Sequence, residues 1–127
     1  MTANFGGKSA IVGVANTEFS KNSGRSETQL AAECVRDAIA DAGLKPSDVD
    51  GMTTFTMDTN DEIEVARAVG IGDLSFYSRV PHGGGAGTGC IHQAAMAIAT
   101  GAAEVVVVCS KRGQQGNPFI RKKGRKW

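Results

Sequence analysis

Residues 81–92 read PHGGGAGTGCIH and join a strand-like run, Leu74 to Val80, to an apolar helical run, Ala94 to Ala99. Glycines let the backbone approach a ligand closely, and the first N–H groups of a helix are free to bind negative charge. A cysteine and two histidines lie in the same stretch. The stretch is either a functional site or an ordinary glycine turn before a helix, and the spacing alone leaves both interpretations open.

The glycine run lacks the standard phosphate-binding patterns. No G-x-x-x-x-G-K-[ST] is present, and G-x-G-x-x-G does not fit from Gly83, Gly85 or Gly87. The run also follows the third predicted strand, whereas the dinucleotide-binding fold has its glycines after the first. We therefore exclude a nucleoside-triphosphate or nicotinamide site.

Outward from this stretch, predicted strands alternate with predicted helices. Ser26 and Gln29 form a capping box at the start of the first helix, and Gly43 suits its end. The predicted strands are Ser9–Ala15, Val49–Thr56, Leu74–Val80 and Glu104–Cys109, and the helices are Ser26–Ala42, Asp61–Val69 and Thr88–Thr100. The last strand has four consecutive valines, which indicate a parallel strand covered on both faces, and the last helix is apolar nearly all round, which indicates burial. The order β-α-β-α-β-α-β predicts an α/β fold with a mostly parallel sheet.

The chain has 127 residues, enough for one domain, and its charges are divided between two parts. All 13 acidic residues precede Lys111, whereas residues 111–127 hold 7 of the 14 basic ones. We expect a folded domain over residues 1–110 and a basic, disordered tail over residues 111–127. The tail is either an arm that binds phosphate groups or a segment not native to the fold, as after truncation or a shifted reading frame; we favour the second.

Cysteine usage and hydropathy limit the class of protein. Cys34, Cys90 and Cys109 show no C-x-x-C spacing, which argues against a disulfide framework and against a metal site. Cys34 and Cys109 fall on apolar faces and are predicted to be core residues. We see no secretory signal and no apolar run long enough to span a bilayer, so we expect a cytoplasmic protein.

Several segments resemble the N-terminal half of a thiolase. They are SAIVGV at 9–14, the AGL and DVDG segments at 42–44 and 48–51, and GAAEVVVV at 101–108. Within that superfamily, NSGR at 22–25 and TTFTMDTN at 53–60 resemble the sterol-carrier-protein thiolase and lipid-transfer-protein group, in particular its steroid side-chain aldolases. The resemblance covers residues 8 to 108 and implies a partial thiolase-like N-terminal domain.

The resemblance implies an enzyme of lipid or steroid metabolism that acts on CoA thioesters, either an acyltransferase or a retro-aldolase. Thiolases place a nucleophilic cysteine at the N-terminus of the third helix. Counting back from Gly101 puts that position within Gly84–Ala86, where no cysteine stands, and Cys90 lies about one turn further on. Cys90 is either a displaced nucleophile or a helix-packing residue; we favour packing. A missing nucleophile agrees with the aldolase-like members.

Two further roles are open near the turn. His82 orients a thioester carbonyl, carries a proton, or only satisfies a turn carbonyl. The backbone N–H groups of the glycine run are expected to bind the oxyanion or thioester of the substrate. The candidate substrate-binding residues are Gly83, Gly84, Gly85 and Gly87.

The resemblance also implies the partners. We expect an acyl-CoA or steroid-CoA substrate, no separate cofactor, an OB-fold partner protein over the site and a homodimer in the full-length form. Because a thiolase has two similar halves, we expect the isolated chain to be inactive and poorly soluble. The alternative is a non-catalytic lipid-, CoA- or partner-binding half-domain with an anion-binding tail. Nucleic acid is not an expected partner because no RNA motif or aromatic interleaving is present.

Overall fold

The computed structural model of the 127-residue chain describes residues 4, 6–18, 24–55, 62–81, 85–110 and 117–122. These residues form an α/β fold, as the sequence predicts. Its elements are β1 (Ser9–Ala15), α1 (Glu27–Asp41), a short 3-10 turn (Pro46–Asp48), β2 (Gly51–Phe55), α2 (Glu62–Val69), β3 (Phe76–Val80), α3 (Ala86–Thr100), β4 (Val105–Cys109) and β5 (Asn117–Lys122).

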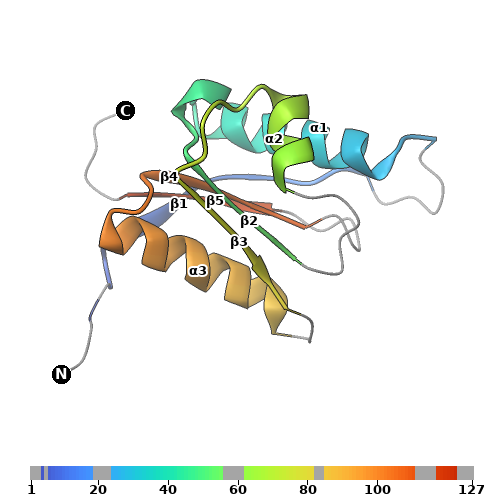
Figure 1. Cartoon of the computed structure of the whole chain (residues 1–127). Helices are drawn as coiled ribbons and strands as arrows, with labels where there is room; N and C mark the ends of the chain where they lie inside the picture. The colour runs from blue at the N-terminus through green and yellow to red at the C-terminus, as the bar shows by residue number, and fades with distance from the viewer. Residues whose placement is uncertain are drawn as a thin grey trace.

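The elements form three layers around one sheet (Figure 1). The strand order is β1-β5-β4-β2-β3, with β2 parallel to both β3 and β4 and with β5 antiparallel to β1 and β4. Helices α1 and α2 cover one face, and α3 covers the other. Each face has its own apolar cluster, one centred on α1 and the other on α3. All five residues of β4 are buried, which confirms the prediction from its valines.

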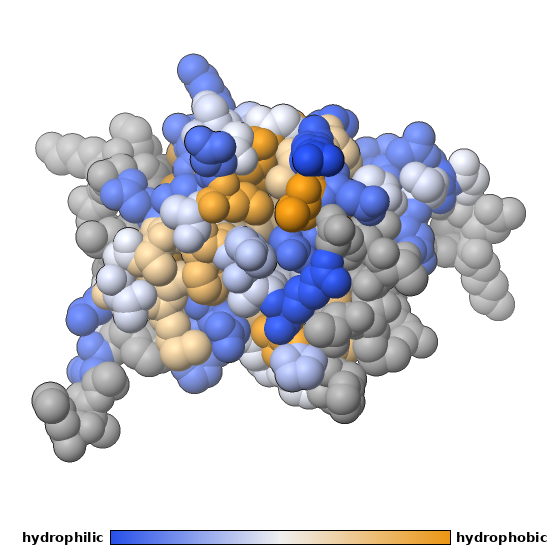
Figure 2. Space-filling model, viewed as in Figure 1, coloured by the Kyte–Doolittle hydropathy of each residue, from blue (hydrophilic) through white to orange (hydrophobic). Residues whose placement is uncertain are grey.

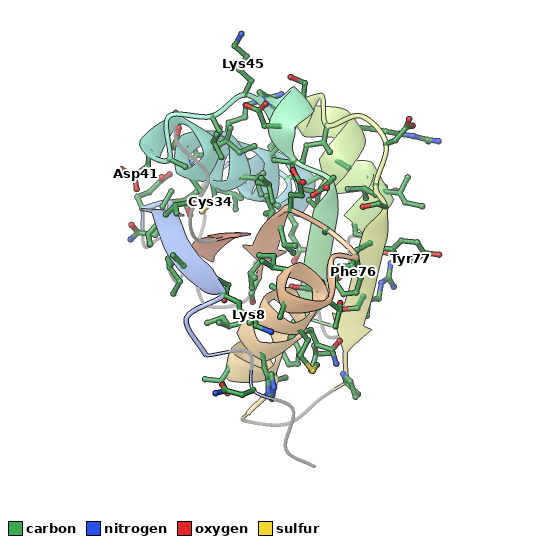
Figure 3. The ribbon with its side chains drawn as sticks, turned by 90° about the vertical axis from the view of Figure 1, so that its left-hand side faces the viewer. Lys8, Cys34, Asp41, Lys45, Phe76 and Tyr77 are labelled. Carbon is green, nitrogen blue, oxygen red and sulfur yellow. The ribbon has the colours of Figure 1, made fainter. Side chains whose placement is uncertain are left out.

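The first helix rests directly on the first strand. The predicted capping box is present: the Ser26 hydroxyl accepts a hydrogen bond from Gln29 N at 3.2 Å, and the Gln29 side chain accepts one from Ser26 N at 2.9 Å. A Cβ at Gly13 would lie 2.4 Å from the carbonyl oxygen of Ala38, so only glycine allows this approach. At the end of α1, Asp41 accepts a hydrogen bond from Val14 N at 2.9 Å. Figure 3 shows Asp41 beside β1.

Helix α3 differs from its prediction in two respects. It begins at Ala86 rather than Thr88, with Gly85 as its N-cap residue. It is buried on one side only, because the sheet packs against that side and no described element packs against the other. Thr88 and His92 are exposed. Over this helix, Figure 2 shows pale orange, weakly apolar side chains at the surface.

The tail contributes a strand, which differs from the disorder we expected for that stretch. Asn117–Lys122 forms β5 between β1 and β4. The physical reason is that two facing strand edges carry unpaired N–H and C=O groups, and an inserted strand satisfies both rows. The rest of the tail, 111–116 and 123–127, lies outside the described residues. That residues 111–127 are not native to the fold stays a prediction.

Candidate functional site

The candidate site lies where the parallel strands end and α3 begins. Strands β2, β3 and β4 run in the same direction, so their carboxyl ends meet at one edge of the sheet. Helix α3 follows β3 after a short connection and starts at that edge, as Figure 1 shows. Ligands of open α/β sheets bind outside the carboxyl ends of the strands. The fold therefore places the glycine turn in the position expected of a binding site.

Cys90 is buried beneath this edge of the sheet and is not exposed at it. It is the fifth residue of α3 and is 2% exposed. Its thiol donates to the Thr54 carbonyl oxygen at 3.5 Å, and its own carbonyl oxygen accepts from the Thr53 hydroxyl at 3.3 Å. Both threonines belong to β2 and are buried. The thiol thus lies between α3 and β2, with its sulfur directed at a strand carbonyl.

The glycines of the turn fall into two kinds. A Cβ at Gly89 would lie 3.0 Å from the Val80 side chain, so close packing explains that glycine. Gly85 and Gly87 are exposed, neither has a positive φ, and no described atom lies within 4 Å of a Cβ built on either. Neither the described packing nor the backbone conformation requires glycine at these two positions. Because neither residue has a side chain, the backbone at the start of α3 is uncovered at these two positions.

Three candidate residues belong to the connection between β3 and α3. His82, Gly83 and Gly84 lie outside the described residues, so their predicted roles stay predictions. The structure therefore brings Gly85, Gly87 and Cys90 to one end of α3, but with the thiol facing inward and the two glycines outward.

Sequence reasoning missed a buried carboxylate at the same edge of the sheet. Glu62, the first residue of α2, is 6% exposed. Its Oε2 accepts from Arg79 Nε at 2.8 Å and from the Thr54 hydroxyl at 3.5 Å. The network joins α2 to the ends of β2 and β3, and its Thr54 is also the residue whose carbonyl oxygen accepts from the Cys90 thiol. No local sequence signal points to this pair, because an acidic residue at a helix start is ordinary and Arg79 is itself exposed.

The other cysteines have packing roles. Cys34 and Cys109 are 4% and 3% exposed, which confirms that they are core residues, and all three cysteines are free thiols. Cys34 Sγ donates to the Ala15 carbonyl oxygen at 3.2 Å, between α1 and β1 (Figure 3). In the described part of the chain, no cluster of three or more His, Cys, Asp or Glu side chains is arranged to hold a metal ion. None of its helices is long and apolar enough to traverse a bilayer.

A surface hollow of about 270 Å³ lies on the opposite face, between α1 and α2. Arg36 crosses it and donates to the Ala68 carbonyl oxygen near the end of α2. The hollow is lined by α1 and α2 residues only: Thr28, Gln29, Ala32, Glu33, Arg36 and Ala68. It is separate from the start of α3 and includes none of the candidate residues.

This fold, with a glycine turn leading into a helix at the carboxyl edge of its sheet, has a known counterpart. The family described as "Thiolase, N-terminal domain" matches residues 9–111, and the chain belongs to that family. The resemblance seen in the sequence is thereby confirmed.

Two curated relatives are more specific. Over 101 residues the chain is 66% identical to the 17-hydroxy-3-oxo-4-pregnene-20-carboxyl-CoA lyase of Mycobacterium tuberculosis and 68% identical to the steroid side-chain-cleaving aldolase of Thermomonospora curvata. Each match covers 80% of this chain and 26% of the relative. The chain therefore spans about a quarter of the length of these relatives.

Solved structures agree with this assignment. The Ltp2-ChsH2(DUF35) aldolase is 68% identical, with a TM-score of 0.78 over 80% of this chain and 27% of that one. A monomeric SCP2-thiolase-like protein from Mycobacterium smegmatis, at 24% identity and a TM-score of 0.69 over 81% of this chain and 23% of that one, shares the fold. The 3-oxoacyl-[acyl-carrier-protein] synthase III of Aquifex aeolicus also shares the fold, with 13% identity and a TM-score of 0.70 over 94% of this chain and 54% of that one.

Proposed function

We propose that this chain is part of a thiolase-fold lyase that shortens a steroid side chain, carried as a CoA thioester, by retro-aldol cleavage. The proposal rests on two relatives at 66% and 68% identity whose names describe steroid side-chain cleavage and a carboxyl-CoA lyase. Because the chain spans 26% of each, the activity belongs to the longer protein, and this chain supplies one portion of its site.

The proposed reaction needs no covalent enzyme intermediate. The side-chain alcohol at C17 loses its proton, the C17–C20 bond breaks and a C17 carbonyl forms. The electron pair of that bond passes to C20, next to the thioester, and creates an enolate. C20 then takes up a proton, so the products are a 17-oxo steroid and a three-carbon CoA thioester. The group that most needs stabilisation is the thioester oxygen, which gains negative charge as the bond breaks.

The burial of Cys90 is the observation that favours carbon–carbon cleavage over acyl transfer. An acyltransferase of this superfamily requires an accessible thiolate, because the thiolate is the nucleophile. The described start of α3 offers none: Gly85 is the N-cap residue, Ala86 is the first helical residue, and Cys90 is 2% exposed with its thiol bonded to a strand carbonyl. The geometry of the described residues supports a reaction without an acyl-cysteine.

The start of α3 is suited to the enolate oxygen. The first N–H groups of a helix lack intrahelical acceptors, and the helix dipole favours negative charge there. Gly85 and Gly87 leave this backbone uncovered, although packing requires glycine at neither position. We propose that their N–H groups, with those of Gly83 and Gly84, hold the thioester oxygen, and that His82 serves as a proton carrier or orients the carbonyl.

The same proposal includes the assembly and its location. The similar Ltp2-ChsH2(DUF35) aldolase has two components in its name. We propose that the complete protein works with a partner of the OB-fold type, forms a homodimer and acts in the cytoplasm, with a steroid-CoA substrate and no separate cofactor.

A chimera tests the activity. The 101 matched residues of the Thermomonospora curvata aldolase are replaced by those of this chain, and the product is purified with the aldolase's own partner. We expect cleavage of 17-hydroxy-3-oxo-4-pregnene-20-carboxyl-CoA, followed as release of the 17-oxo steroid, and retained turnover in Cys90→Ala. Loss of turnover in a Cys90→Ala chimera that keeps its circular dichroism spectrum would refute the assignment to cleavage.

A glycine substitution tests the backbone site. Gly87→Ala adds one methyl group to an exposed helix position and adds no described clash. If the backbone there receives the thioester, the methyl group displaces the substrate, and kcat/KM falls by roughly 10- to 100-fold. Gly72→Ala is the matched control, since Gly72 also has open space around its Cβ position but lies away from α3. Equal activity of the two variants would exclude Gly87 from the site.

A further inference from the structure

The buried Glu62 carboxylate bridges the ends of two neighbouring strands. Thr54 and Arg79 are partners in the ladder between β2 and β3, and each is the last residue but one of its strand. Glu62 Oε2 accepts a hydrogen bond from Arg79 Nε at 2.8 Å and one from the Thr54 hydroxyl at 3.5 Å. One oxygen atom, presented by the first residue of α2, thus contacts both strands at the edge of the sheet where the candidate site lies.

Helix α3 rests on the same two strand ends from the opposite face of the sheet (Figure 1). The Cys90 thiol donates to the Thr54 carbonyl oxygen at 3.5 Å. Val80 is the last residue of β3, and its side chain would lie 3.0 Å from a Cβ at Gly89, so helix and strand are in close contact there. Gly89 and Cys90 are the fourth and fifth residues of α3. The first turns of the helix are therefore seated on the strand ends that the carboxylate holds.

A carboxylate in this place affects geometry more than net stability. The Glu62 side chain is 8% exposed, and the cost of removing a charge from water offsets much of the attraction within a buried ion pair. A charge-assisted hydrogen bond is nevertheless short and directional, so it restricts how the strand ends can move. The proposed oxyanion site consists of backbone N–H groups that point along the axis of α3. Any displacement of the helix on the sheet redirects those groups.

We propose that Glu62 is a positioning residue of the candidate site. Its carboxylate fixes the ends of β2 and β3 from one face of the sheet. Those strand ends fix the start of α3 on the other face, which aims the N–H groups of Gly85 and Gly87 at the thioester oxygen. The catalytic part of this inference rests on the proposed function. The mechanical part, that Glu62 holds α3 in place, can be measured without turnover.

Thiol labelling of the 127-residue chain tests the mechanical part. Both Cys90 and Cys34 are buried, and a buried thiol reacts only when its surroundings open. Cys34 lies beside β1, which β5 and β4 separate from β2. In the range where both rates are independent of urea, we expect Glu62→Gln to raise the ratio of Cys90 to Cys34 labelling about tenfold. Asp50→Asn weakens a carboxylate bond to Val105 N at the opposite edge of the sheet, and this control should leave the ratio within about twofold of the parent.

Kinetics of the chimera with the Thermomonospora curvata aldolase test the catalytic part. We expect Glu62→Gln to lower kcat by about tenfold or more and to change KM by less than about twofold, because the N–H groups act on charge that develops in the transition state. Arg79→Gln should have the same effect, and the double variant Glu62→Gln/Arg79→Gln no larger an effect than either change alone, since both break one network. Glu64→Gln, exposed on the same helix, is the matched control and should keep the parental kcat.

A purely structural role for Glu62 predicts other results. Equal acceleration of Cys90 and Cys34 labelling in Glu62→Gln, or an unchanged Cys90 rate, would overturn the proposal. Losses of kcat that multiply in the double variant, or a parental kcat in Glu62→Gln, would also overturn it. A parent chimera without turnover would refute the proposed function instead, and the labelling ratio would still decide whether Glu62 holds α3 in place.

Discussion

Replacing the Asp50 side chain should loosen the start of β4. The Asp50 carboxylate accepts hydrogen bonds from Glu104 N at 3.0 Å and from Val105 N at 2.9 Å, which hold the beginning of β4. The Asp50 carbonyl oxygen accepts from Ser75 N at 2.8 Å and Phe76 N at 3.2 Å, at the beginning of β3. A side-chain substitution removes only the first pair, so the loss can be assigned to β4.

The expected loss of stability follows from the two hydrogen bonds that the Asp50 carboxylate accepts. A hydrogen bond to a charged group contributes about 1.5–3 kcal/mol, and an unpaired buried N–H costs about 1–3 kcal/mol. Val105 is 4% exposed, whereas Glu104 is only partly buried, so water can replace one of the two bonds more readily than the other. We expect Asp50→Ala to lower the free energy of unfolding by about 3 kcal/mol. Asp50→Asn, which keeps an acceptor oxygen but loses the charge, should lower it by about 1 kcal/mol.

Urea unfolding followed by circular dichroism measures these differences. Asp37→Asn is the control, since Asp37 lies on the exposed side of α1, and its substitution should change stability by no more than about 0.5 kcal/mol. The expected order of stability is parent and Asp37→Asn, then Asp50→Asn, then Asp50→Ala. If Asp50→Ala unfolds at the same urea concentration as Asp37→Asn, the carboxylate does not hold β4 and the reasoning fails.

Two substitutions and one labelling experiment probe the close approach of β1 to α1, the buried Glu62 carboxylate and the Cys90 thiol. Gly13→Ala should lower stability by about 3 kcal/mol or prevent folding, because its Cβ would lie 2.4 Å from a backbone oxygen of α1, whereas Gly72→Ala should be near neutral in the same melt. Glu62→Gln should cost about 1–2 kcal/mol by leaving Arg79 without its carboxylate, and the exposed Glu64→Gln should cost less than half of that. Cys90, at 2% exposure, should resist a thiol reagent in the native chain at neutral pH and react fully in guanidinium; rapid native labelling of Cys90 would contradict the packing role.

The parts of the fold predicted from sequence are those with strong local signals. Ser26 and Gln29 marked the start of α1, and Gly43, at positive φ, marked its end. The valines of β4 marked a strand covered on both faces. In each case a few neighbouring residues determine the conformation, so no knowledge of distant partners was required.

The parts that could not be predicted depend on contacts between distant residues. Strand β5 carries a proline and two basic residues, so its local sequence indicates a tail; it becomes a strand because β1 and β4 leave a gap. Glu62 sits at a helix start, an ordinary place for an acid, and only the fold brings it to Arg79, 17 residues away. The small, apolar residues of α3 led the sequence analysis to predict burial all round the helix. Among the described residues, other elements pack against only one side of it.

The residue that stands at the start of α3 distinguishes acyl transfer from retro-aldol cleavage in this fold. The presence of a cysteine elsewhere in the helix does not. Sequence counting placed the nucleophile position within Gly84–Ala86, and the structure starts α3 at Ala86 with Gly85 as its cap. In the proposed site a side chain at that point would meet the substrate, whereas the Cys90 thiol, one turn later, donates to the Thr54 carbonyl oxygen of β2. The same helix end can therefore stabilise an anionic oxygen through its N–H groups without offering a thiol for acylation. A lyase that breaks a carbon–carbon bond next to a thioester requires the first property and not the second, which is why the glycines, and not the cysteine, are the residues on which the proposed chemistry depends.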